Sequence, residues 1–492
     1  MKLSQIALAV AAVAAAPAFA ATGSLQTLFG VTPANTVYIS GASALSGSLT
    51  NVVAANCAGG SANVKSLTIN GSTSDGRVTV CTTSSLDGQF AAPFAVVKRD
   101  TNGSFDGVGP VIAQTALTKW ADVNTCDDVN SRCGLDSTTA IVPHAGLSDV
   151  DTNIWIGANN TGALSIPVPT DTASTVFNGG FAGQGFGVMV SESLYNAMMA
   201  KQKAEGRLPA DCVAGDFTAG KCQPSISKEE YAAVIDAGNF AYVANGALSG
   251  DAGVINLCRR VETSGTQASS NVYFLNNSCG NASPTKGFKS PKAVDFSGGG
   301  VNPVAWNSAS GDAVTGNFDD FGGAFALFEG SGTGDARNCV IRRNNGNNPN
   351  NVADGLGTYA IGWISLENAP AAGWKYLKLD GVSPNAYQVP VGSTADVAGG
   401  GAADGWAQDG NQRINVVRGY YDAAPELEML WPSSTGFGTF LTTLKNTFAN
   451  PAAVNTRGIF QANGVFTHAG NETQVHKGTR NGNFCAPQAL AE

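Results

Sequence analysis

Four short segments of the sequence combine glycine with serine or threonine, each after a short apolar run. Their hydroxyl-bearing residues are Ser43, Ser46, Ser104, Ser148, Ser264 and Thr266, and Gly265 lies between the last two. Hydroxyl and backbone N–H groups are neutral donors, and a helix that begins at such a turn adds the positive end of its dipole. Together these groups suit a small oxyanion, which needs many donors around it.

Two charged residues accompany these turns. Asp149 follows Ser148, and Arg260 lies four residues before Ser264. Arginine offers a planar fork of donors that matches an oxyanion. A carboxylate repels an anion unless that anion carries a proton to donate, as hydrogen phosphate does near neutral pH and sulfate does not. The pair therefore favours phosphate, with a helix N-cap for Asp149 and a surface salt bridge for Arg260 as the structural alternatives.

Short apolar runs that alternate with helical patterns predict an α/β fold. The predicted strands cover residues 36–40, 94–98, 140–143, 186–190, 254–258 and 359–365. A helix follows residue 190, and another is expected over 227–237, where Ser227 and Glu230 form a capping box. Residues 295–356 and 392–412 are rich in Gly, Asn, Asp and Ser and are predicted as long surface loops.

The order of these motifs resembles the periplasmic phosphate-binding proteins of ABC transporters, which have the type II periplasmic-binding fold. The segments that carry the resemblance are ISGASALSGS, NGSFDGVGPVI, AGLSDVD, SISKEEYAAVIDAGN, CRRVETSGTQASSNVYFL and GTYAIGWISLENA, within residues 36 to 390. The first turn departs from the family pattern, because Leu45-Ser46 stands where the family has Thr-Phe. The chain is also longer than typical members and has additional loops and cysteines.

The resemblance implies two lobes, the first of them discontinuous in sequence. Lobe 1 is expected to comprise residues 30–184 and 356–465, lobe 2 residues 185–355, and a C-terminal tail residues 466–492. Two crossovers near residues 183–190 and 359–364 would form the hinge. The ligand would bind between the lobes and close them.

The resemblance also assigns the ligand-binding residues: Ser43, Ser46, Ser104, Ser148, Asp149, Arg260, Ser264, Gly265 and Thr266. It implies a monomeric protein that captures phosphate or a related oxyanion and delivers it to an inner-membrane ABC permease. The alternative is a secreted or cell-surface protein that keeps the fold for adhesion or extracellular scavenging. The long Gly/Asn-rich loops and the altered first turn favour this alternative.

The first twenty residues have the three parts of an export signal. Lys2 provides the positive charge, residues 6–15 the apolar stretch, and Ala18-Phe19-Ala20 the cleavage motif. The apolar stretch is too short to span a bilayer, so the protein is expected in the periplasm or outside the cell without direct membrane insertion. The formal net charge of −9 argues against nucleic acid as a partner, because phosphate backbones require clustered cations.

Ten cysteines in an exported chain predict disulfides. Proximity in the sequence suggests the pairs Cys57–Cys81, Cys126–Cys133, Cys212–Cys222, Cys258–Cys279 and Cys339–Cys485, although spacing does not fix the connectivity.

Residues that could support catalysis or bind a metal are few. The chain has three histidines and no G-x-S-x-G motif, and the Gly-rich segment 330–334 lacks the lysine of a P-loop. Residues 100–106 alternate like a calcium loop but lack its glycine at position six and its glutamate at position twelve. No catalytic residue, metal or cofactor is therefore expected.

Overall fold

The computed structural model describes thirteen stretches of the chain. They are residues 22–155, 174–237, 254–276, 304–305, 314–317, 324–348, 350–389, 391, 405–408, 414–450, 459–461, 465–468 and 471–474. The predicted export signal, Cys279 and Cys485 lie outside them. Within these stretches no helix has the length and hydropathy needed to cross a membrane.

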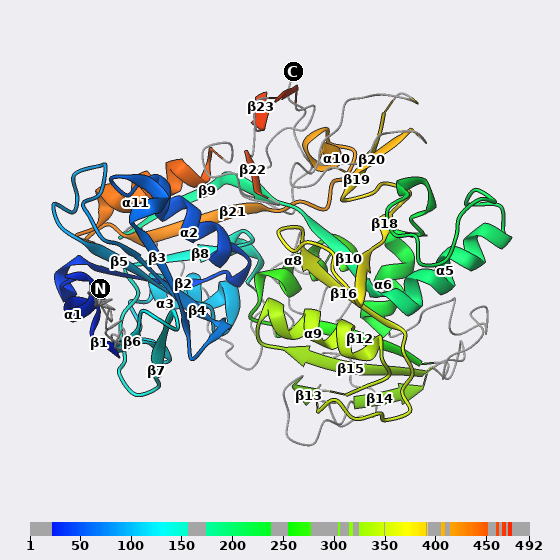
Figure 1. Cartoon of the computed structure of the whole chain (residues 1–492), viewed down its shortest axis with the longest axis horizontal. Coiled ribbons are helices and arrows are strands. Elements are labelled where there is room, and N and C mark those ends of the chain that lie inside the picture. Colours follow the sequence, from blue (N-terminus) through cyan, green and yellow to red (C-terminus); the bar gives the residue numbers. More distant parts are fainter. Residues whose placement is uncertain are drawn as a thin grey trace, which may run out of the picture.

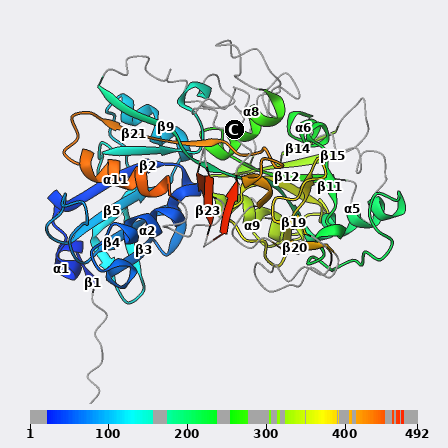
Figure 2. The same ribbon diagram turned by 90° about the horizontal axis from the view of Figure 1, so that it is seen from above.

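Most described strands belong to two sheets, which form two bodies side by side (Figures 1 and 2). The larger sheet runs in the order β1 (Thr22–Gly23), β6 (Trp120–Asp127), β7 (Arg132–Asp136), β3 (Val64–Ile69), β4 (Ser72–Cys81), β5 (Phe94–Arg99), β2 (Thr36–Gly41), β8 (Ala145–Ser148), β21 (Glu426–Pro432), β9 (Thr175–Gln184) and β22 (Ile459–Gln461). Its helices are α1 (Leu25–Phe29), α2 (Ser46–Ala55), α3 (Gly109–Ile112) and α11 (Gly438–Phe448). We call this body the first lobe.

The smaller sheet forms the second lobe. Its order is β13 (Val304–Ala305), β15 (Ala324–Gly330), β12 (Val254–Arg260), β16 (Ala360–Ser365), β10 (Phe186–Ser191) and β17 (Trp374–Tyr376), with β14 (Val314–Asn317) also paired to β15. Its helices are α5 (Glu192–Ala204), α6 (Lys228–Ala237), α8 (Gly265–Leu275) and α9 (Thr333–Arg343). Shorter elements are β11 (Ser225–Ile226) with β18 (Lys378–Leu379), β19 (Ala386–Gln388) with β20 (Trp406–Gln408), β23 (Val465–His468) with β24 (Asn471–Gln474), and α10 (Ile414–Val417).

The central strands are apolar on both faces because helices or loops cover them. All six residues of β5 and of β10 are buried, and β2 pairs in parallel with both β5 and β8. One core of the first lobe packs α2 and α11 against β2 through residues such as Leu49, Leu444 and Ile39. Parallel strands covered by helices carry turns at their carboxyl ends, and this is where the hydroxyl-rich segments of this chain occur.

The predicted α/β class and the discontinuous first lobe are confirmed by the sheets. The chain leaves the first lobe between β9 and β10 and returns in β21, so β21 and β22 complete the larger sheet. At the crossovers the two passes of the chain lie together: the N–H of Gln184 donates to Pro425 O (3.0 Å) and the N–H of Phe186 donates to Ala423 O (2.9 Å). These paired backbones form the connection between the lobes.

Three expectations are corrected. The strand predicted at 140–143 begins later, as β8, because Ile141 instead bridges to Leu117. Residues 295–356 are not only surface loop, since β15 and α9 lie within them. Residues 359–364, predicted as the second crossover, form β16 inside the smaller sheet, where it pairs with β10 and β12. The second lobe therefore extends well beyond residue 355.

Four disulfides are present in the described part of the chain. Cys57–Cys81, Cys126–Cys133 and Cys212–Cys222 confirm three predicted pairs. The fourth joins Cys258 to Cys339, so the predicted pairs Cys258–Cys279 and Cys339–Cys485 are both wrong. The physical reason is that α9 packs on β12, which brings two cysteines 81 residues apart in sequence into contact. This bond fastens the helix that begins at Thr333 to the strand that carries Arg260.

Candidate functional site

The predicted site residues come together where the two lobes meet. Three of the four segments follow neighbouring strands of the larger sheet: β2 leads to a 3-10 turn and α2, β5 to the 3-10 turn Gly103–Gly107, and β8 to Asp149. The fourth follows β12 of the smaller sheet, where Ser264 is the N-cap of α8. Parallel strands place these ends at one edge of each sheet, as the sequence predicted.

The lobes approach each other closely at this point, and glycine permits the approach. The N–H of Phe105 in the first lobe donates to Thr263 O in the second (3.0 Å). A Cβ atom on Gly265 would lie 2.3 Å from Ser104 Oγ and 2.8 Å from Asp149 Cβ, well inside contact distance. Gly103 is under a similar constraint, because its Cβ would lie 2.8 Å from Ser264 Cα. The resemblance named Gly265 for its backbone, and the contact shows that a side chain there cannot be accommodated.

Asp149 is held at the centre of this contact. It is 1% exposed, and its backbone N–H donates to Ser104 Oγ (3.2 Å). Its Oδ1 atom is buried and has no hydrogen-bond partner among the described residues, so it makes no capping bond. Burial raises the pKa of Asp149 to about 6, although nearby Arg260, Ser104 and Lys98 oppose the rise. The carboxyl is therefore mostly ionised at neutral pH and has an acceptor atom free to receive a proton donor.

Arg260 is also fully buried, at 1% exposed, which is inconsistent with a surface salt bridge. Its Nη1 donates to Ser43 Oγ (3.1 Å) and Thr333 Oγ1 (2.9 Å), while Nη2 and Nε donate to the carbonyls of Ser331 (2.7 Å) and Gly330 (3.3 Å). All these partners are neutral. Burial lowers the pKa of Arg260, with Asp149 opposing this change, but a guanidinium stays charged in a protein. No carboxylate lies within ion-pair distance of it in the described part of the chain.

The hydroxyl groups of the site differ in their availability. Ser148 Oγ donates to Val150 O (2.5 Å), and Ser46 Oγ donates to the Asp100 carboxylate (2.6 Å). Both hydroxyl groups are therefore already engaged in hydrogen bonds within the protein. Thr266 Oγ1, in the first turn of α8, is buried and has no partner among the described residues. Ser264 makes no capping bond to α8 through its side chain. Thr266 and Ser264 are therefore the hydroxyls best placed to meet a ligand.

A cavity of about 280 Å³ lies beside Arg260 and is lined from both lobes, and it includes Ser43 and Thr333, which accept hydrogen bonds from Arg260. Ser43, Ser46, Gly47 and Arg77 come from the first lobe, and Thr333, Gly334, Arg337, Glu367 and Asn368 from the second. Sequence reasoning missed Thr333, Gly334 and Arg337, because residues 295–356 were predicted as loop. The available signal was Gly330-Ser331-Gly332-Thr333 after the apolar run of β15, the same pattern that marked the other four segments.

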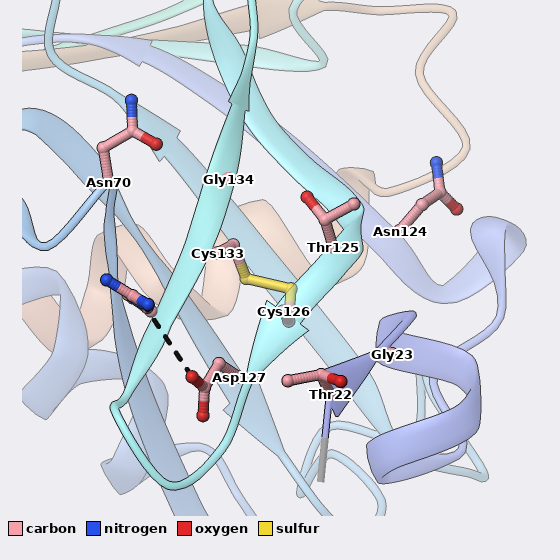
Figure 3. A pocket seen from close by; sticks show the side chains of 10 residues that line it. Thr22, Gly23, Asn70, Asn124, Thr125, Cys126, Asp127, Cys133 and Gly134 are labelled. Atoms are coloured by element: carbon pink, nitrogen blue, oxygen red, sulfur yellow. Dashed lines mark ion pairs between the residues drawn. A yellow bond between two sulfur atoms is a disulfide. The ribbon is translucent and has the colours of Figure 1, made fainter. Parts of the chain in front are cut away.

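A second cavity, of about 630 Å³, lies far along the larger sheet from this contact (Figure 3). Thr22, Asn70, Asn124 and the Cys126–Cys133 disulfide surround it, and Arg132 is paired with Asp127 (3.9 Å). Because the arginine is compensated by a partly exposed carboxylate, nothing in this cavity calls for a charged ligand. Elsewhere in the described part of the chain, no group of three His, Cys, Asp or Glu side chains is placed to hold a metal ion.

Comparison with solved structures finds matches of similar outline. One of them is the crystal structure of a Clostridium perfringens protein assigned as a phosphate ABC transporter substrate-binding protein, with bound phosphate. The two chains are 10% identical with a TM-score of 0.42, over 87% of this chain and 99% of that one. At these values the likeness carries no conclusion about function. No family model and no curated protein matches the chain.

Proposed function

We propose that this protein binds a small oxyanion, phosphate in the first place, at the contact between its two lobes. The observation that carries the proposal is the buried Arg260, which has only neutral hydrogen-bond partners in the described part of the chain. A buried guanidinium with no carboxylate at ion-pair distance is only partly compensated, even with Asp149 nearby, and a bound anion would complete the compensation. The unpartnered Thr266 Oγ1, on the same side of the contact, adds a donor.

Asp149 supports phosphate over sulfate. Its free Oδ1 atom accepts a hydrogen bond from a protonated oxyanion but repels one that has no proton. Because its pKa is about 6, the carboxyl is ionised at the pH at which hydrogen phosphate still carries a proton. Export directed by residues 1–20 would place the protein outside the inner membrane, where it would deliver the anion to a permease. No contact in the described part specifically favours the adhesion alternative.

Asp149→Asn is expected to lower the ratio of phosphate affinity to sulfate affinity by about tenfold or more, which corresponds to about 1.4 kcal/mol. The amide keeps an acceptor oxygen but loses the charge that repels sulfate and can donate a hydrogen bond to it. Calorimetric titration of both anions into the wild type and the variant at pH 7.5 measures the ratio.

Asp216→Asn is the matched control, because Asp216 is exposed in the second lobe and bonds only its local turn. Its ratio should equal that of the wild type. An unchanged ratio in Asp149→Asn, with the fold intact by circular dichroism, would show that Asp149 is structural and would remove the basis for phosphate selectivity.

A further inference from the structure

The cavity beside Arg260 is larger than one tetrahedral oxyanion requires. Its volume of about 280 Å³ corresponds to roughly nine waters at about 30 Å³ each. Ser43 and Thr333 line this cavity and also accept hydrogen bonds from Arg260, so they connect it to the proposed oxyanion position. A ligand whose first group lies near Arg260 would therefore have room for a second group on this side.

The charged groups of the cavity indicate that this second group of the ligand is anionic. Arg77, on β4, has a buried Nε atom without a partner and forms no ion pair with a described residue. Arg337, on α9, donates to Asn368 Oδ1 (3.2 Å) and likewise has no carboxylate at ion-pair distance in the described part. The two guanidinium groups come from opposite lobes. An anion between them would neutralise both and hold the lobes together.

Among the described residues that line the cavity, the one carboxyl group does not cancel this positive charge. Glu367 is half-buried and makes no ion pair with a described residue. Burial raises its pKa well above the usual value, with Asp149 acting in the same direction and Arg77 opposing it. Glu367 therefore carries less negative charge near neutral pH than an exposed glutamate would. The cavity remains positive, and a protonated Glu367 would itself be a donor.

We infer that the cavity lined by Arg77 and Arg337 receives the second anionic group of a small ligand whose first group lies at Arg260. The ligand class is a compound with two linked anionic groups, of which diphosphate is the simplest. This inference rests on the proposed oxyanion site and extends it, because a chain that binds phosphate alone at Arg260 needs no further pair of arginines. Ser43 and Thr333 line the cavity and accept hydrogen bonds from Arg260, so they lie between the two positions.

The test compares phosphate with diphosphate, both without divalent cations, by calorimetric titration. The variants are Arg77→Gln and Arg337→Gln. The control is Arg132→Gln, because this arginine on β7 has a 55% exposed side chain, is paired with Asp127 and does not line the cavity. Wild type is expected to bind diphosphate about tenfold or more tightly than phosphate, since each charge-assisted contact adds to affinity. Arg77→Gln and Arg337→Gln should each lower this diphosphate-to-phosphate ratio by about tenfold. The control should keep the wild-type ratio.

Three outcomes would overturn the inference. If diphosphate binds no more tightly than phosphate, the second position does not exist, although the phosphate site stands. If Arg77→Gln weakens both ligands equally, the cavity is part of the site for a single anion. If neither ligand binds to wild type, the proposed function fails as well. Arg77→Lys, which keeps the charge without the planar fork, should retain part of the ratio and replaces Arg77→Gln if that variant does not fold.

Discussion

Arg260→Ala is expected to weaken phosphate binding by on the order of 100-fold or more, because it removes several kcal/mol of charge-assisted bonding. The guanidinium of Arg260 is the buried positive charge of the site. It donates hydrogen bonds to Ser43 of the first lobe and to Thr333 of the second. Its loss removes the anion's main counter-charge and also one of the bonds that join the lobes. Calorimetric titration with phosphate measures the effect.

Two companion variants separate charge from geometry. Arg260→Lys keeps the charge but replaces the planar fork with a compact ammonium group, so its affinity should fall between wild type and Arg260→Ala. Arg132→Ala removes an exposed arginine of the first lobe and should leave phosphate affinity unchanged. An Arg260→Ala protein that is folded by circular dichroism and binds phosphate as wild type does would contradict the role given to Arg260.

Gly265→Ala is expected to reduce phosphate affinity by about five- to 150-fold, the equivalent of the roughly 1–3 kcal/mol typical of forced overpacking. The new methyl group would lie 2.3 Å from Ser104 Oγ and 2.8 Å from Asp149 Cβ, so the first lobe must move away from α8. Small-angle X-ray scattering should show a larger radius of gyration in the presence of phosphate, together with the weaker binding in calorimetry.

Gly438→Ala provides a matched control for the same chemical change. Gly438 is the first residue of α11, as Gly265 is of α8, and its added Cβ would have no atom within 4 Å. It should bind phosphate like wild type and be equally or more stable, since alanine favours the helix. Equal affinity and equal radius in Gly265→Ala and Gly438→Ala would show that the close contact is not needed for binding.

The sequence predicted best those features that depend on local patterns. β2, β5, β10 and β12 each begin with or contain a short apolar run, and they occur where predicted. The capping box of α6 is confirmed by the bond from the Glu230 N–H to Ser227 Oγ (3.0 Å) and the reciprocal bond to Glu230 Oε2 (2.7 Å). The physical reason is that strand length, capping and turn chemistry involve residues close in sequence.

Features that depend on long-range packing could not be predicted in the same way. All residues of β16 are buried, and such a strand fits the centre of either sheet, so the sequence did not show which lobe contains it. Cys258 pairs with Cys339 because α9 packs on β12, a contact that spacing does not encode. Arg259 is buried and paired with Glu262 (2.9 Å) and Glu329 (3.0 Å), although a charged residue beside Arg260 would be expected in solvent from its type alone.

The candidate site was predictable in part for the same reason. Arg260, Asp149 and Gly265 follow recognisable strand ends, and the structure brings them to one place. Arg77 lies within a strand, where nothing in the alternation of side chains indicates that it faces the other lobe. Thr333 was hidden by the glycine- and asparagine-rich composition around it. Such residues can be identified as part of the site only once the packing of the two lobes is known.

The central claim is that the contact between the lobes binds an oxyanion, and the titration of phosphate into the purified wild-type protein at pH 7.5 tests it most directly. We predict saturable binding of one phosphate per chain, with weaker binding of sulfate because of the ionised Asp149 carboxylate. The absence of saturable binding for phosphate, arsenate and sulfate, in protein shown to be folded, would contradict the account and leave Arg260 as a structural residue that joins the lobes.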